Sequence, residues 1–333
     1  MEDQLTNEQM KMQAFQNIIV KMEYIWFDGY NICSKTKYEN WVLNLNEGLS
    51  REDVLSRCPL WEYTENDSIS VILSPVKVYQ NPLEASEMPS FIVLCERMDA
   101  SSIANVPYRK IGERDRRSIQ DEVTEDFHIG FGFECNFIDR STNKPLHSDN
   151  IKTKLNVSKD SYRVGASHAG GRSIVDTFAA ACHTLRIPLI ETHPTGNSSS
   201  SWFIGTDLSP AVEAIDDFLV MRYLINKMTE DLNVFVDMYS AMRFSFSTKE
   251  MREEGGEDLF SDIRDTFDKK RPYHKLDVPV FVRRNHFKGH MNDYRFTATD
   301  NPYDIVMDVA KALSDDSGTK ETEEPVAQAQ NHE

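Results

Sequence analysis

The stretch GFGFECNFID, residues 130–139, holds the side chains whose types and spacing point most directly to chemistry. Large apolar residues alternate in it with small or polar ones, a pattern typical of a β-strand with one packed face and one face open to a cleft. Glu134 and Asn136 are two residues apart, so both are expected on the open face. Two carboxylates at this spacing would hold a hard metal ion, whereas one carboxylate beside an amide holds it less well. The stretch therefore indicates part of an active site with one weakened ligand.

Composition and charge argue against several classes of partner. The 333 residues are 40% apolar, which is enough for a substantial core, and the formal net charge is −17. This charge argues against nucleic acid, because phosphate backbones are held by an excess of Lys and Arg. We find no secretory signal and no apolar run of the roughly twenty residues that cross a bilayer. The five scattered cysteines fit reduced thiols, so we expect a cytoplasmic protein with no membrane partner.

The elements that must position these residues fall into two units. We expect a polar arm at residues 1–19 and a small, strand-rich N-terminal domain at residues 20–105. A larger domain is expected at residues 106–313, where strands mix with helices. Residues 314–333 are acidic and lack an apolar period, which predicts a disordered tail.

Three segments carry signals for helices. The run SREDVLSRC begins at Ser50, which can cap a helix, and GRSIVDTFAAACHTL has an apolar stripe at helical spacing. A third helix is expected to begin in SPAVEAIDDFLVMRYLINKM, with Ser209 as the cap and Pro210 in the first turn. The Gly- and Ser-rich run HPTGNSSSS lacks the GKS pattern of a phosphate-binding loop and is interpreted as a flexible loop.

Short runs along most of the chain resemble, in the same order, those of the glutamine synthetase family, the ATP-dependent ligases that join ammonia to glutamate. These runs are EYIWFDG, SISVILSPVKVYQNP, FIVLCE, RVGASHAGGRSIV, MRYLINKMTEDLNV, FSTKEMREEGG and ATDNPYDIV. The resemblance implies an α+β fold, in which a small β-grasp-like N-terminal domain precedes a catalytic-type domain with an antiparallel half-barrel sheet backed by helices. It also implies a homo-oligomeric ring, a decamer in the eukaryotic type, or co-assembly with an active relative.

The family's reaction passes through a phosphorylated glutamate and needs several carboxylates around two or three Mg²⁺ or Mn²⁺ ions with ATP. By resemblance, Glu134 and Asn136 stand at the family's E-x-E pair, so its second carboxylate has become an amide. Glu191 resembles the next metal carboxylate. At the position of a further metal glutamate the chain has Ser201 or Trp202.

Other family features are missing from the sequence. Arg243 stands where the family has the histidine of a Gly-rich, glutamate-binding loop, and the loop itself is absent. Asn292 stands where the family has another metal glutamate. The segment WEYTENDS, residues 61–68, lacks the glycine and the preceding aspartate of the family segment that closes the neighbouring subunit's site.

For two groups of residues, both a functional and a purely structural interpretation are possible. Glu134, Glu191 and His193 are remnant candidates for a single metal ion, against the alternative of satisfied polar residues on a solvated sheet face. Near the position of the family's phosphate-binding arginines lie Arg283, Arg284 and Arg295. A nucleotide contact there competes with a surface patch or a subunit interface.

We interpret the sequence as a glutamine synthetase-like pseudoenzyme with a structural or regulatory role, for which no cofactor is certain. The alternative is an active glutamate–ammonia ligase, or a related amide-forming ligase, with a rearranged site that uses Mg²⁺ or Mn²⁺ with ATP. A third interpretation is a nucleotide sensor that binds without turnover and needs only part of that site.

Overall fold

A computed structural model places most of the chain. It describes residues 15–29, 31–44, 49–65, 69–85, 87–99, 119, 123, 126–148, 164, 169–238, 242–253, 280–284, 287–296 and 301–319. None of the helices within these ranges is long and apolar enough to span a lipid bilayer.

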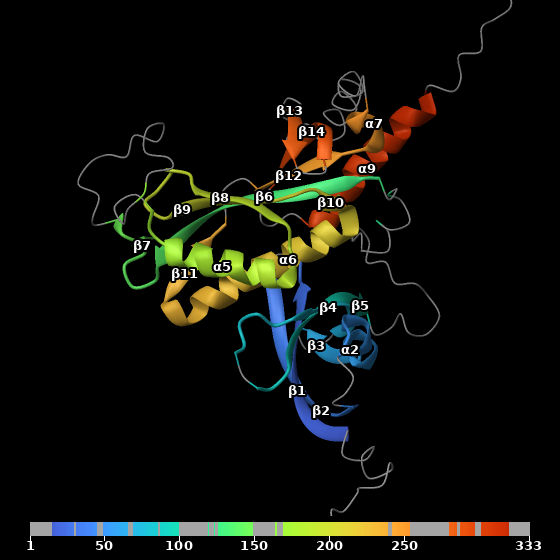
Figure 1. Cartoon of the computed structure of the whole chain (residues 1–333), viewed down its shortest axis with the longest axis vertical. Coiled ribbons are helices and arrows are strands. Elements are labelled where there is room, and N and C mark those ends of the chain that lie inside the picture. Colours follow the sequence, from blue (N-terminus) through green and yellow to red (C-terminus); the bar gives the residue numbers. More distant parts are fainter. Residues whose placement is uncertain are drawn as a thin grey trace, which may run out of the picture.

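Five strands near the N-terminus form a sheet, sheet A, in the order β2-β1-β5-β4-β3 (Figure 1). Their bounds are β1 Phe15–Phe27, β2 Ile32–Asn44, β3 Trp61–Glu65, β4 Ile69–Gln80 and β5 Ser90–Asp99. The central pair β1 and β5 is parallel, and the other neighbours are antiparallel. Helix α2, Arg51–Arg57, begins where the Ser50 hydroxyl accepts the Asp53 N–H at 3.0 Å, so the predicted cap is confirmed.

Each face of sheet A contributes residues to a different core. On β1, Met22, Tyr24 and Trp26 point toward α2 and form a small core of their own. Ile25 points the other way and joins the main core of the molecule. The N-terminal sheet is therefore continuous with the larger unit rather than tethered to it, because one of its faces completes the larger core.

The larger sheet, sheet B, is antiparallel throughout, with the order β13-β14-β12-β6-β9-β8 and three short strands that also pair with β6. Its strands are β6 His128–Asp139, β7 Lys144–Pro145, β8 Leu189–Pro194, β9 Ser201–Thr206, β10 Ser209–Pro210, β11 Val234–Asp237, β12 Met242–Ser247, β13 Val280–Arg284 and β14 Phe287–Phe296. The strand β6 is central, since it pairs with β9 along one edge and with β11 and β12 elsewhere. Its side chains therefore lie in the middle of the sheet.

Helices cover one face of sheet B. They are α5 Arg172–Leu185, α6 Ala211–Thr229, the 3-10 turn η3 Glu230–Leu232, α7 Lys249–Arg252 and α9 Pro302–Thr319. Figure 1 shows α5 and α6 between sheet B and sheet A. On the sheet B side, the Phe218 ring of α6 stacks on Phe131 of β6 with centroids 4.4 Å apart. Because α6 touches both sheets, most of its circumference is apolar and buried.

Polar contacts join sheet A to α6. The Asp217 carboxylate accepts a hydrogen bond from the Tyr79 hydroxyl at 2.7 Å and pairs with Lys77 at 3.1 Å. The Arg222 guanidinium lies over the Phe27 ring, 5.2 Å from its centroid, and burial lowers its pKa to about 10. These contacts fix how the two sheets sit on either side of the helix.

Three predicted boundaries are corrected by the structure. The strand β1 starts at Phe15, inside the expected arm, because its partner β2 continues to Asn44 and pairs with it there. Pro210, not Ser209, is the N-cap of α6, because both residues first pair with β6 as the short strand β10. Helix α9 continues to Thr319, into the segment expected to be a tail. Residues 320–333, and the expected domain boundary at residue 105, lie outside the described residues.

Candidate functional site

The open face of β6 carries Glu134 and Asn136, as the alternation of the strand predicts. Both side chains are partly exposed. The residues on the opposite face are buried: Phe131, Phe133, Cys135 and Phe137. Paired residues of antiparallel strands share a face, so Glu134 lies beside Phe203 and Asn136 beside Ser201 of β9. The prediction of one packed and one open face is therefore confirmed.

Hydrogen-bond donors gather on one carboxylate oxygen of Glu134. Its Oε1 accepts from the Thr195 hydroxyl at 2.8 Å, the Asn197 amide at 2.5 Å and the Ser201 hydroxyl at 2.5 Å. Thr195 and Asn197 belong to residues 195–200, which we call the serine loop. A carboxylate oxygen that accepts three hydrogen bonds has little remaining capacity to accept another or to coordinate a metal ion.

The neighbouring amide is satisfied by the same loop. Asn136 Oδ1 accepts from the Ser198 hydroxyl at 2.6 Å and lies 2.8 Å from the Ser200 hydroxyl. Ser199 and Ser200 are 3% and 0% exposed. The interpretation of this run as a flexible loop is thus wrong: its hydroxyls pack onto β6, because the polar face of that strand offers acceptors that must be paired.

These residues do not fit the divalent-metal cluster that the family resemblance implies. A hard cation needs several charged oxygens, but here Asn136 is neutral, Ser201 offers a hydroxyl, and Glu134 Oε1 is engaged by donors. Within the part of the chain that the structure describes, no three His, Cys, Asp or Glu side chains are grouped closely enough to hold an ion. Around Glu134 Oε1 and Asn136 Oδ1 the open face instead carries a hydrogen-bond network with the serine loop and Ser201.

Sequence reasoning missed Phe203, which lies across the same face. Its ring is over Gly132, where an added Cβ would come within 2.7 Å of Phe203 Cζ. The His193 ring stacks on it with centroids 5.3 Å apart, and the Arg243 guanidinium lies 4.5 Å from its centroid. Glycines at paired positions of adjacent strands, Gly132 and Gly205, were the available signal that an aromatic ring covers the sheet there.

The three remnant metal candidates are not brought together. His193 of β8 pairs with Phe203 of β9, and Phe203 pairs with Glu134 of β6. The backbones of His193 and Glu134 are therefore two strand spacings apart, roughly 10 Å. Glu191 is exposed and pairs with Gly205, one row further along the sheet. Each of the three residues therefore has surroundings of its own.

Arg243 reaches the open face because β11 and β12 follow one another along β6. Asp237 of β11 pairs with Asn136, and Arg243 of β12 pairs with Gly132. Residues 239–241, between these two strands, lie outside the described part. Sequence reasoning also missed Asp237, which shares the open face with Asn136 through this pairing.

Trp202 faces away from the open side. It pairs with Cys135, is 1% exposed, and donates its indole N–H to the Gly170 carbonyl at 2.8 Å. The Arg172 guanidinium lies 4.8 Å from its ring centroid. Of the two residues considered for the missing metal glutamate, Ser201 rather than Trp202 therefore shares the face of Glu134.

The remaining candidates are placed by strand register. Arg295 of β14 pairs with Arg243, two residues along β6 from the Glu134 position. Asn292 pairs with Phe246, whose partner on β6 is Ile129, five residues or roughly 17 Å from Glu134. The hairpin strand β13 carries Arg283 and Arg284 at the sheet's far edge. Register places Arg295 next to Arg243 in the sheet and leaves the other three further from Glu134.

Comparison with known proteins identifies relatives along most of the chain, although no protein-family model matches it. A glutamine synthetase of Bradyrhizobium diazoefficiens is 23% identical over 88% of this chain and 96% of its own length. A glutamine synthetase of Rhizobium meliloti is 23% identical over 80% of this chain and 82% of its own. Another, from Gallus gallus, is 24% identical over 80% of this chain and 72% of its own.

The fold agrees with these relatives. A Plasmodium falciparum glutamine synthetase solved by electron cryomicroscopy matches with a TM-score of 0.59 and 11% identity, over 95% of this chain and 76% of that one. Sheet A and the curled antiparallel half-barrel of sheet B, backed by helices, confirm the α+β fold expected from the resemblance. The sequence relatives and the shared fold agree, and together they support the assignment of the chain to the glutamine synthetase family.

Proposed function

We propose that this chain is a glutamine synthetase-fold protein without ligase activity, kept for a structural or regulatory role. The observation that carries the proposal is the network around Glu134, whose Oε1 accepts donors from Thr195, Asn197 and Ser201. A side chain held in this way is preorganised for hydrogen bonding rather than for an ion. The proposal treats Asn136 and Ser201 as replacements of metal carboxylates.

Loss of these ligands bears directly on the chemistry. Phosphoryl transfer to glutamate is catalysed mainly by positioning and by charge neutralisation, and the metal ions bridge the phosphate oxygens. Removing a single group that stabilises developing charge costs about 3–4 kcal/mol in well-studied enzymes. Loss of two carboxylates would therefore reduce the rate by several powers of ten.

The direct test is phosphate release from Mg²⁺-ATP by the purified chain, with glutamate and ammonium added together, singly and not at all. The glutamine synthetase of Bradyrhizobium diazoefficiens, purified in the same way, is the positive control. We expect no release above the protein-free rate in any arm. Release that requires both glutamate and ammonium, and that Glu134→Gln abolishes, would refute the proposal.

The alternative function, a ligase with a rearranged site, is favoured by two observations. Asp237 pairs with Asn136 on the open face, so a carboxylate has appeared on the neighbouring strand. The Arg243 guanidinium lies over the Phe203 ring on the same face, which would suit a phosphate-bearing substrate or a bound nucleotide. Activity that is lost in Asp237→Asn would establish this alternative, and ATP binding without turnover would indicate the sensor.

We also propose assembly into a homo-oligomeric ring, or into mixed rings with an active relative. Support comes from three large apolar residues that share one face of the β1–β2 hairpin and are more than half exposed: Ile19, Tyr38 and Val42. Light scattering on the eluted protein should give the mass of a ring. Tyr38→Asp should shift that mass toward the single chain, and a monomeric wild-type protein would contradict assembly by the chain alone.

We propose a cytoplasmic location, because all five cysteines are free thiols, as is usual in a reducing compartment. Labelling of a tagged chain in cell fractions would test it, and recovery from a secreted fraction would contradict it.

A further inference from the structure

A cavity of about 540 Å³ lies on the other side of the helices from Glu134, where sheet A meets α5 and the end of α6. Its walls come from β1, from the turn after β4, from the first turns of α5 and from α6 with η3. Its volume falls within the range of small-molecule sites, about 300–1,000 Å³. The cavity is separate from the family's catalytic face, so a ligand bound in it would not require the chain to be a ligase.

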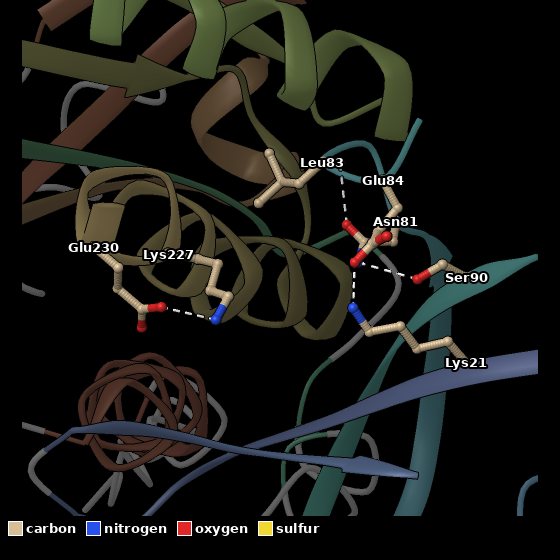
Figure 2. A network of polar contacts seen from close by, with 7 residues as sticks. All are labelled: Lys21, Asn81, Leu83, Glu84, Ser90, Lys227 and Glu230. Carbon is tan, nitrogen blue, oxygen red and sulfur yellow. Dashed lines mark hydrogen bonds and ion pairs between the residues drawn. The ribbon is translucent and has the colours of Figure 1, made fainter. Parts of the chain in front are cut away.

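Acidic groups outnumber basic groups at this cavity. Figure 2 shows two ion pairs at its edge, Lys21 with Glu84 and Lys227 with Glu230, the latter at 2.7 Å. Both lysines of the region are thus already paired with an acid. Two further acids line the cavity, Glu23 and Asp231, which leaves an excess of two negative charges.

The position of Glu84 is fixed by the turn that carries it. The Asn81 side chain accepts the Leu83 N–H at 3.1 Å and donates to the Ser90 hydroxyl at 3.2 Å (Figure 2). The surrounding acids also raise the pKa of the lysines. The pKa of Lys227 is raised by its hydrogen bond to Glu230 and further by the nearby Glu23 charge.

Two polar groups in the wall are almost fully buried. Glu23 and Tyr223 are each 4% exposed, and both line the cavity. The Tyr223 hydroxyl faces the Glu23 carboxylate, and it makes no hydrogen bond of ordinary length and angle to the residues that the structure describes. Burial first, and then the neighbouring Glu23, raise the pKa of Tyr223, so its hydroxyl stays neutral. A buried hydroxyl whose nearest acceptor is poorly placed, beside a buried carboxylate with no cation paired to it among the described residues, is costly unless something in the cavity binds both groups.

The rest of the wall limits what this occupant can be. Besides the charged groups and Tyr223, the lining has four apolar side chains, Leu83, Ile174, Met228 and Leu232, and three neutral polar ones, Asn81, Ser173 and Thr177. A bare metal ion does not suit the site, because the described acids do not gather in a group of three and the cavity is far larger than an ion. We propose that this cavity binds a small organic cation, a primary ammonium on a short apolar body, with the ammonium at Glu23 and the Tyr223 hydroxyl.

Such a ligand would contact sheet A and α6 at once, so its binding would stabilise the junction between them. Phenethylamine is a suitable probe, because it carries one ammonium group and a compact apolar ring. Phenethyl alcohol and hydrocinnamate are matched neutral and anionic controls of similar shape. Calorimetric titration of the full chain at neutral pH measures the affinity, and thermal denaturation measures the stabilisation.

We expect saturable binding of phenethylamine with a rise in Tm, and no binding of the two controls. Glu23→Gln keeps the shape but removes the charge, and should weaken binding about tenfold or more. Glu87→Gln makes the same change on an exposed residue of the same region outside the cavity, and should leave binding unchanged.

Tyr223→Phe keeps the proposal testable if Glu23→Gln does not fold. This variant removes the buried hydroxyl, so it should raise the Tm of the ligand-free protein and weaken binding of phenethylamine. Absence of saturable amine binding, equal binding of the alcohol or the carboxylate, or an affinity that neither variant changes would overturn the proposal. None of these results depends on phosphate release from ATP.

Discussion

Two acidic side chains on opposite sides of the central helices meet very different surroundings. Glu134 on sheet B is partly exposed, and three donors converge on its Oε1. Glu23 on sheet A is 4% exposed and lines a cavity whose lysines are paired with other acids. The difference indicates that the face where the family places its chemistry is satisfied internally, whereas the interdomain cavity retains unbalanced charge.

The largest effect is expected at the junction that holds these two regions in place. Asp217→Ala removes the acceptor of the buried Tyr79 hydroxyl and the partner of Lys77. We expect a loss of about 2–4 kcal/mol in the free energy of unfolding, measured by urea denaturation. Asp217→Asn keeps an acceptor and should lose less, whereas an equal loss in both variants would show that charge alone matters.

A smaller effect is expected on the Glu134 side. Ser201→Ala removes one of the donors to Glu134 from a residue that is 3% exposed. The expected loss is about 1–3 kcal/mol, because a hydrogen bond to a carboxylate is stronger than one between neutral groups. Ser141→Ala is the matched control, because Ser141 is exposed and its hydroxyl bonds the Asp139 carboxylate; it should change stability by less than about 0.5 kcal/mol. If both variants behave alike, the network around Glu134 contributes no special stability.

On the Glu23 side we expect a substitution that increases the free energy of unfolding instead of lowering it. Tyr223→Phe removes a buried hydroxyl that makes no hydrogen bond of ordinary geometry to the described residues and whose nearest acceptor is Glu23, so stability should rise by about 1 kcal/mol. Tyr24→Phe is the comparison, since the Tyr24 hydroxyl donates to the Pro59 carbonyl at 2.9 Å and its removal should destabilise. A loss of stability in Tyr223→Phe would mean that its hydroxyl has a partner in the folded chain.

The smallest effect lies outside both regions and concerns pH. The pKa of Asp53 is lowered, chiefly by its hydrogen bonds with Ser50 at the start of α2. A carboxyl with a lowered folded-state pKa stabilises the protein above its unfolded value of about 3.9, and this contribution is lost as pH falls through the folded value. Asp53→Asn should therefore flatten the acid side of the stability curve slightly. An unchanged curve in this variant would show that protonation of Asp53 does not affect the stability of the protein.

Short sequence patterns correctly predicted the features that depend on neighbouring residues, such as the faces of a strand and the start of a helix. The alternation in GFGFECNFID placed Glu134 and Asn136 on one face of β6, and the cap residue Ser50 marked the start of α2. The collinear runs predicted the family and the arrangement of the two sheets. By contrast, β1 was predicted to begin later, because its first residues are ordered by pairing with β2 rather than by their own apolar pattern.

The candidate site depended on contacts that no local pattern encodes. The serine loop lies some 60 residues beyond Glu134 in the chain, and only the register of β9 against β6 brings its hydroxyls there. Phe203 likewise reaches His193 and Arg243 through three strand pairings. The Glu23 cavity combines segments from both units, so it follows from how α6 packs and not from any motif.

The most direct test of the account is titration of Mn²⁺ into the full chain, followed by electron paramagnetic resonance. We predict that the spectrum of the free ion keeps its full amplitude, because the donors on Glu134 leave no set of carboxylates to bind it. Glu134→Gln and Asp237→Asn should then titrate like the wild-type protein. Stoichiometric loss of the free-ion signal that either variant restores would contradict the account and point to a working metal site on the open face of β6.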